Sequence, residues 1–312
     1  MKPYQRAYIE ITNVCNLQCD FCPEVERPAR RMSLPLFERA ILEVQNLVDE
    51  VTFHVMGEPL AHPEFSKFVD VCAQQAMPIH LTTNGTLLEH AAAGGKPRAE
   101  VLLNPIFRQI NFSLQSFPSN TRRSAEDRAA QFESYLQHIF QFTQRALIER
   151  PDLYINFRLW NIGTDESARD GNRKFLDPIC REFDCDLRAG PAEGVGRANV
   201  GFRKSYRVKG RLYVHFDSRF EWPSLERAVL QTKGHCHALR SHFGILSDGT
   251  VVPCCLDKEA GIALGRINEN CLPGELARLL ANDRARRLRK GFDRGELCEP
   301  LCQRCSFISR FS

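Results

Sequence analysis

Strand and helix patterns alternate along the first 190 residues of this 312-residue chain, and this alternation most restricts its fold. Short apolar runs typical of strands occur at residues 8–11, 51–55, 78–82, 110–114, 154–160 and 185–188. Amphipathic patterns between them predict helices at residues 34–48, 64–75, 124–149 and 173–183, the first of them capped by Ser33. Repeated strand–helix units produce a parallel sheet with helices outside, so we expect an α/β fold with an open sheet or a barrel.

After residue 190 the regular alternation of strand and helix patterns ends. A glycine-rich stretch at residues 190–201 reads as a loop, and after it come short strands, turns and one basic helix at 274–290. We therefore expect a barrel domain over residues 1–200, a linking segment over 201–235 and a small C-terminal domain over 236–312. Hydrophobic residues make up 43% of the chain, which is enough to build a core for each domain.

The chain has no secretory signal and no long apolar run, so we expect it to be cytoplasmic. It has thirteen cysteines, a high number for a cytoplasmic protein. Disulfides are disfavoured in the cytosol, so clustered cysteines indicate metal or redox chemistry. Three lie near the N-terminus and seven in the last quarter; the others, Cys72, Cys180 and Cys185, lie singly, and Cys72 has the helical spacing of a core residue.

The N-terminal cysteines Cys15, Cys19 and Cys22 follow the first predicted strand with the spacing CxxxCxxC. Three thiolates can hold three irons of a [4Fe–4S] cube and leave the fourth iron open, which is the mark of a catalytic metal site. A zinc site made of the same three thiolates with His54 or water is the alternative. Polar groups recur after the other strands, at residues 57–59, 83–85, 113–116 and 158–161, where barrels carry their active sites.

Residues 10–23, which contain this triad, resemble the signature of the radical S-adenosylmethionine (SAM) superfamily, and residues 55–60 resemble its glycine-glycine-glutamate-proline motif, with Met56 in place of the first glycine. The resemblance implies a partial (βα)6 TIM-like barrel over roughly residues 4–190. It also implies a [4Fe–4S] cluster on the triad and cleavage of SAM to a 5′-deoxyadenosyl radical that removes a substrate hydrogen. By the same resemblance, SAM contacts are assigned to Phe21 (adenine), Gly57, Glu58 and Pro59 (amine), Ser113 (ribose) and Arg158 (carboxylate).

The later cysteines resemble those of the SPASM/twitch extension of some radical SAM enzymes, which holds auxiliary iron–sulfur clusters. Cys236 is followed by Gly249, four residues separate Gly249 from Cys254, and Cys302 and Cys305 form a CxxC pair. The resemblance implies one auxiliary [4Fe–4S] cluster with the ligands Cys236, Cys254, Cys302 and Cys305. Cys255, Cys271 and Cys298 are left unassigned, although Cys298 could displace one ligand, and a zinc ribbon is the alternative.

These features together predict an oxidoreductase that dehydrogenates a small molecule such as a sugar or an aminocyclitol. A radical SAM enzyme that modifies peptides is the second hypothesis, and a non-catalytic zinc- or iron-binding protein is the third. We expect a flavodoxin- or ferredoxin-type electron donor and no membrane partner. The net charge of +4 is too small to indicate nucleic-acid binding. The sequence does not identify the catalytic base, and Asp217, Glu221 and Trp222 are only possible substrate contacts.

Overall fold

The computed structural model describes residues 2–91, 95–159, 166–187, 205–217 and 221–311. Asn161 and the glycine-rich segment 190–201 lie outside these ranges. In the part that is described, no helix combines the length and the hydrophobicity needed to cross a bilayer.

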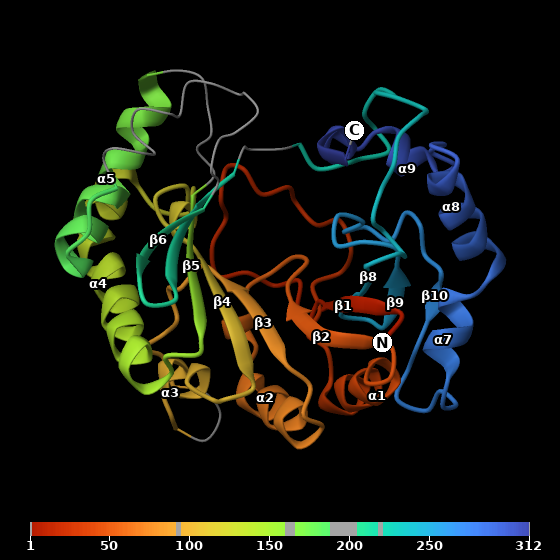
Figure 1. Cartoon of the computed structure of the whole chain (residues 1–312), viewed down its shortest axis with the longest axis horizontal. Coiled ribbons are helices and arrows are strands. Elements are labelled where there is room, and N and C mark those ends of the chain that lie inside the picture. The colour runs from red at the N-terminus through yellow and green to blue at the C-terminus, as the bar shows by residue number, and fades with distance from the viewer. Residues whose placement is uncertain (1, 92–94, 160–165, 188–204, 218–220, 312) are drawn as a thin grey trace.

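A single curved sheet of ten strands organises the fold, in the order β10-β9-β8-β1-β2-β3-β4-β5-β7-β6 (Figure 1). The strands are β1 (Tyr4–Ile9), β2 (Val48–Phe53), β3 (Ile79–Thr83), β4 (Phe107–Ser113), β5 (Tyr154–Leu159), β6 (Ser205–Lys209), β7 (Leu212–Phe216), β8 (His242–Ile245), β9 (Thr250–Val252) and β10 (Gly265–Arg266). β1 to β5, β7 and β8 pair in parallel, whereas β6, β9 and β10 pair antiparallel with their neighbours. The predicted α/β class and the parallel sheet of a partial barrel are confirmed.

The predicted sixth strand at residues 185–188 is wrong for residues 185–187, and residue 188 lies outside the described ranges. Residues 185–187 have no regular secondary structure, and β7 takes the sixth parallel place by pairing with β5. The physical reason is the end of the preceding helix: Asp184 has a left-handed backbone with φ of 52°, and the Cys185 N–H donates to the carbonyl of Cys180 at 3.2 Å. This arrangement closes a helix C-terminus and brings the Sγ atoms of Cys180 and Cys185 to 3.7 Å.

Helices cover the outside of the curved sheet (Figure 1). They are α1 (Leu34–Val44), α2 (Phe65–Gln74), α3 (Arg98–Leu102), α4 (Ala125–Glu149), α5 (Glu166–Phe183), α7 (Glu275–Leu280), α8 (Asp283–Asp293) and α9 (Pro300–Gln303), with 3₁₀ turns η1 (Pro59–Ala61), η2 (Leu114–Ser116) and η3 (Ser306–Phe311). Ser33 caps α1 as predicted, since its side chain accepts from the Leu36 N–H. The predicted basic helix 274–290 is instead two helices, because the Asn282 side chain accepts from the Ala285 N–H and starts α8.

β6 and β7 lie within the segment 201–235, and β8 joins β1 from the C-terminal region. Residues far apart in the sequence therefore build one continuous sheet. The division of the chain into domains at residues 200 and 235 stays a prediction.

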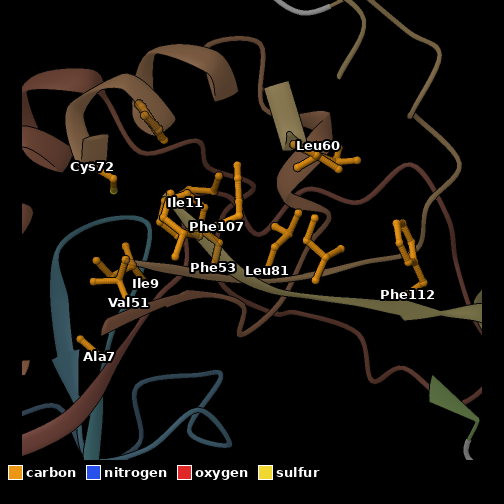
Figure 2. Packing of buried hydrophobic residues seen from close by; sticks show 14 of the residues in the cluster. Ala7, Ile9, Ile11, Val51, Phe53, Leu60, Cys72, Leu81, Phe107 and Phe112 are labelled. Atoms are coloured by element: carbon orange, nitrogen blue, oxygen red, sulfur yellow. The ribbon is translucent and has the colours of Figure 1, made fainter. Parts of the chain in front are cut away.

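The two faces of the sheet differ in polarity, as the alternation of side chains along each strand requires. On the outer face, Ile9, Val51, Phe53 and Leu81 are fully buried, and Figure 2 shows them among the apolar side chains that also include Cys72. Cys72 is a core residue, as its helical spacing predicts. The inner face carries polar side chains on the same strands, and these line the cavity described below.

Candidate active site

A cavity of about 480 Å³ occupies the inside of the curved sheet. Its volume falls in the range of ~300–1,000 Å³ that is usual for small-molecule sites. All three N-terminal triad cysteines line it, and so do five cysteines of the C-terminal region: Cys236, Cys254, Cys255, Cys302 and Cys305. The two cysteine sets, more than 200 residues apart in sequence, therefore open onto one space.

The triad cysteines lie close enough to influence one another electrostatically. Burial is the main cause of a raised pKa at all three thiols. Together with the negative charge of neighbouring groups, it raises the pKa of Cys15 to about 11 and that of Cys19 to about 12. The Cys22 N–H donates to the Cys19 carbonyl at 3.0 Å, and the Cys19 thiol donates to the Ser116 carbonyl at 3.3 Å. Cys19 is buried, Cys15 is half-buried and Cys22 is exposed. Thiols with a raised pKa become thiolates readily only when a bound metal compensates their charge, so the donor set suits a cluster.

Among the described residues, no three histidine, cysteine, aspartate or glutamate side chains are close enough to hold a single metal ion. In a [4Fe–4S] cube each thiolate binds a different iron, so the sulfurs lie farther apart than around one ion. The triad geometry is therefore compatible with a cluster.

The triad loop packs against the segment that follows β2. The Glu58 N–H donates to the Val14 carbonyl at 3.0 Å, and Gly57 has a left-handed backbone with φ of +75°. A Cβ atom at Gly57 would lie 2.3 Å from the Thr12 carbonyl oxygen, which is backbone and cannot rotate away. Only glycine allows this close approach.

Alanine at Gly57 should therefore displace the triad loop. We expect it to lower the free energy of unfolding by about 2–4 kcal/mol, because a left-handed backbone and an overpacked contact both cost energy. Gly274→Ala is the matched control: its φ is +85°, but nothing lies within 4 Å of the added Cβ. Anaerobic denaturant titration of both variants measures the difference, and equal losses would show that the contact with Thr12 does not matter.

The Glu58 carboxylate ties the ends of β2 and β3 together. One oxygen accepts from the Thr83 hydroxyl at 2.6 Å and the other from the Asn84 N–H at 2.7 Å. Burial raises its pKa, and these hydrogen bonds counteract the rise. The Asn84 amide in turn donates to the Asn16 side chain at 3.0 Å, inside the triad. The turn after the third strand was recognised in the sequence, but this role of Asn84 in supporting the triad was missed.

Most of the residues assigned to SAM lie on the cavity wall: Phe21, Gly57, Glu58, Ser113 and Arg158. Pro59 is buried at the start of η1 and does not line the cavity. Burial lowers the pKa of Arg158, and the nearby Asp217, Tyr8 and Cys255 partly counteract this effect. The guanidinium therefore lies near Cys255, on the side of the cavity that carries C-terminal cysteines. The structure thus gathers these residues around one cavity, and their individual roles stay predictions.

Four C-terminal cysteines, the ones assigned to the auxiliary cluster, also form a group. Besides burial, negative charge on Cys236 and Cys305 raises the pKa of Cys302. Negative charge on Cys255, Cys236 and Cys302 likewise adds to the effect of burial on the pKa of Cys254. Burial is the main cause of the raised pKa of each of these thiols. They line the cavity together, which suits a cluster by the same reasoning as for the triad.

The three unassigned cysteines differ in position. Cys255 lines the cavity and forms a hydrogen bond with the Tyr8 side chain. Cys271 and Cys298 do not line it, and the Cys298 Sγ packs against Gly291 in α8. Cys298 is therefore poorly placed to displace a ligand at the cavity.

Polar side chains line the cavity on every neighbouring strand, and sequence reasoning missed most of them: Tyr8, Thr52, His80, Asn111, Asn156 and His215. Asn111 links two strands, since its side chain accepts from the Asn156 amide at 2.9 Å. Of the possible substrate contacts, Asp217 and Trp222 line the cavity, and Asp217 pairs with Arg310 at 2.9 Å. Glu221 does not line it, and its carboxylate pairs with Arg227.

Comparison with known families gives two matches along the chain. Residues 9–149 match the radical SAM superfamily, and residues 236–306 match SPASM, an iron–sulfur cluster-binding domain. These matches contain the two cysteine sets that line the cavity. A tungsten-containing aldehyde ferredoxin oxidoreductase cofactor-modifying protein from Pyrococcus furiosus is 32% identical over 85 residues, which span 26% of this chain and 24% of that protein.

Solved structures resemble the whole chain at low sequence identity, so they show the fold alone. BtrN in complex with AdoMet and 2-DOIA has a TM-score of 0.54 at 15% identity, over 98% of this chain and 94% of BtrN. Native anSMEcpe with bound AdoMet and Cp18Cys peptide has a TM-score of 0.55 at 15% identity, over 98% and 87%. SuiB of Streptococcus suis bound to precursor peptide SuiA has a TM-score of 0.50 at 13% identity, over 97% and 71%.

Proposed function

The chain belongs to the radical SAM superfamily and carries a SPASM domain, and from this premise we propose that it removes two electrons and two hydrogens from a polar small molecule. Such an enzyme binds a [4Fe–4S] cluster and SAM, which together supply a 5′-deoxyadenosyl radical, and an auxiliary iron–sulfur cluster. The observation that carries the proposal is that both cysteine sets open onto one cavity.

Residues of this chain would hold and orient the reactants. Cys15, Cys19 and Cys22 would hold the cluster that binds SAM, and Cys236, Cys254, Cys302 and Cys305 would hold the auxiliary cluster. Glu58 would orient the SAM amine and Arg158 its carboxylate, with Phe21, Gly57 and Ser113 completing the SAM site. An auxiliary cluster beside the same cavity suits an oxidation, because it offers a place for the second electron.

The lining of the cavity supports a polar substrate without a large charge. Arg6 and His80 both pair with Glu50, and Asp217 pairs with Arg310. Burial, with help from Arg158, lowers the pKa of His54 to about 4, so this imidazole is neutral at pH 7 and can accept a hydrogen bond from a hydroxyl. Hydroxyl groups on a sugar or an aminocyclitol would match such a wall. The complex of BtrN with 2-DOIA supports a small ligand in this fold.

Deuterium transfer tests the proposal. Protein reconstituted anaerobically is mixed with SAM, a reductant (dithionite, or a flavodoxin or ferredoxin as the proposed natural donor) and a panel of C-deuterated cyclitols, aminocyclitols and sugars. We expect deuterium in 5′-deoxyadenosine and a product that has lost two hydrogens. Peptides are the second panel, since anSMEcpe and SuiB were solved with peptides. Deuterium transfer from a peptide alone would contradict the small-molecule proposal and favour a peptide-modifying enzyme.

A further inference from the structure

An ion pair and hydrogen bonds hold the segment that follows the triad, at residues 24–27, against the C-terminal region. The Arg27 guanidinium donates to both oxygens of Glu10 at 2.9 Å, and the buried Glu10 carboxylate also accepts from the N–H and the hydroxyl of Ser247. The carboxylate of Glu259 accepts from the backbone N–H groups of Glu26 and Arg27 at 3.1 and 3.2 Å. Two carboxylates thus connect the loop that follows one cysteine set to the segment that carries part of the other.

Lys258 lies between these two segments. It is only 7% exposed, and its ammonium group donates to the Glu24 carbonyl at 2.7 Å and pairs with Glu259. Glu24 comes two residues after Cys22, and Lys258 comes four residues after Cys254. A cation from the C-terminal region is therefore held beside the triad loop, where burial weakens solvent screening.

We propose that Lys258 is a positioning residue for the SAM-binding cluster, which fixes the loop after Cys22 and makes the bound cluster easier to reduce. Reduction adds a negative charge to the cluster, and a nearby buried cation stabilises that charge. Glu259 partly offsets the effect, because it pairs with the same ammonium group. The inference rests on the assignment of Cys22 as a ligand within the proposed function.

A redox titration monitored by electron paramagnetic resonance tests this role, with the SAM-binding cluster identified as the one whose signal changes when SAM is added. For Lys258→Met, we expect about tenfold less reduced cluster at a given potential, which equals a midpoint about 59 mV more negative for one electron. Lys258→Arg keeps the charge and should restore the midpoint. Lys67→Met, at an exposed lysine that pairs with Glu64, should leave it unchanged.

Glu259→Gln separates the effect of charge from general damage to the loop. This variant leaves the Lys258 charge uncompensated, so the midpoint should move in the opposite direction, to less negative potential. Shifts of the same sign in Lys258→Met and Glu259→Gln would overturn the proposal, and so would an unchanged midpoint in Lys258→Met with full iron content. If Lys258→Met loses iron, Lys258→Gln provides the same test.

The measurement needs no substrate. A failure of the midpoint shift would therefore leave the proposed oxidation standing, and a failure to oxidise any polar small molecule would leave the role of Lys258 standing. Loss of the SAM-sensitive signal in Cys22→Ala is expected from the ligand assignment on which both proposals depend, and retention of that signal would contradict both.

Discussion

Alanine at Cys15, Cys19 or Cys22 should reduce the formation of 5′-deoxyadenosine from SAM to background, a loss of ~1,000-fold or more, because the cofactor supplies the chemistry that the protein cannot. Each of these thiols lines the cavity, and the loop that carries them is fixed by contacts with Gly57, Glu58 and Asn84. The loss should be the same for all three variants, since a cluster that lacks any one of three ligands is lost or badly held. Chromatography of reaction mixtures with dithionite measures the nucleoside.

Cys271→Ala is the matched control for these variants. Cys271 is half-buried and does not line the cavity, so its replacement should leave 5′-deoxyadenosine formation unchanged. Retention of SAM cleavage in any triad variant that lacks the cluster would contradict the assignment of that cysteine. A matching loss in Cys271→Ala would show that the assay reports general instability of cysteine variants instead of loss of a ligand.

The double variant Cys302→Ala/Cys305→Ala has the second largest expected effect. It should lose one of two clusters, so that the iron content falls from about eight to about four per chain. SAM cleavage without substrate should stay within about tenfold of the unmodified protein, because the triad is untouched, whereas formation of oxidised product should stop. Iron analysis and product analysis on the same sample separate the two effects.

Cys298→Ala provides the comparison for this double variant. Cys298 forms a CxxxC pair with Cys302 in sequence, but its sulfur packs against Gly291 and does not line the cavity. Its replacement should leave the iron content at the level of the unmodified protein. A loss of about four irons in Cys298→Ala would make it a ligand and would require a different set of four.

Much of the fold could be predicted because its first five strands are local features of the sequence. β1 to β5 are apolar runs flanked by helices with recognisable caps, such as Ser33 before α1 and Ser124 before α4. The sixth parallel strand could not be found in this way. β7 is five residues long with alternating burial, so nothing in its own sequence distinguishes it from an antiparallel hairpin strand. The pairing of β8 with β1 joins segments more than 230 residues apart, which periodicity cannot reveal.

In the candidate site, too, some residues could be predicted from local sequence and others could not. Residues in the loops that follow strands, such as Gly57 and Glu58, could be predicted because strand ends of a parallel sheet meet at one edge. Tyr8, Asn111 and Asn156 lie within strands, where an alternating polar residue is usually expected to face water. Only the curvature of the sheet turns that face toward a cavity. The contact of Lys258 with the loop after Cys22 depends on folding of the whole chain, so no local pattern indicates it.

Metal and sulfide analysis of the anaerobically purified protein tests the central claim most directly, which is that the two cysteine sets hold two iron–sulfur clusters on one cavity. We expect about eight irons and about eight acid-labile sulfides per chain, with no zinc. Zinc bound without iron would contradict the claim, because it would make the cysteines on the cavity a pair of structural zinc sites.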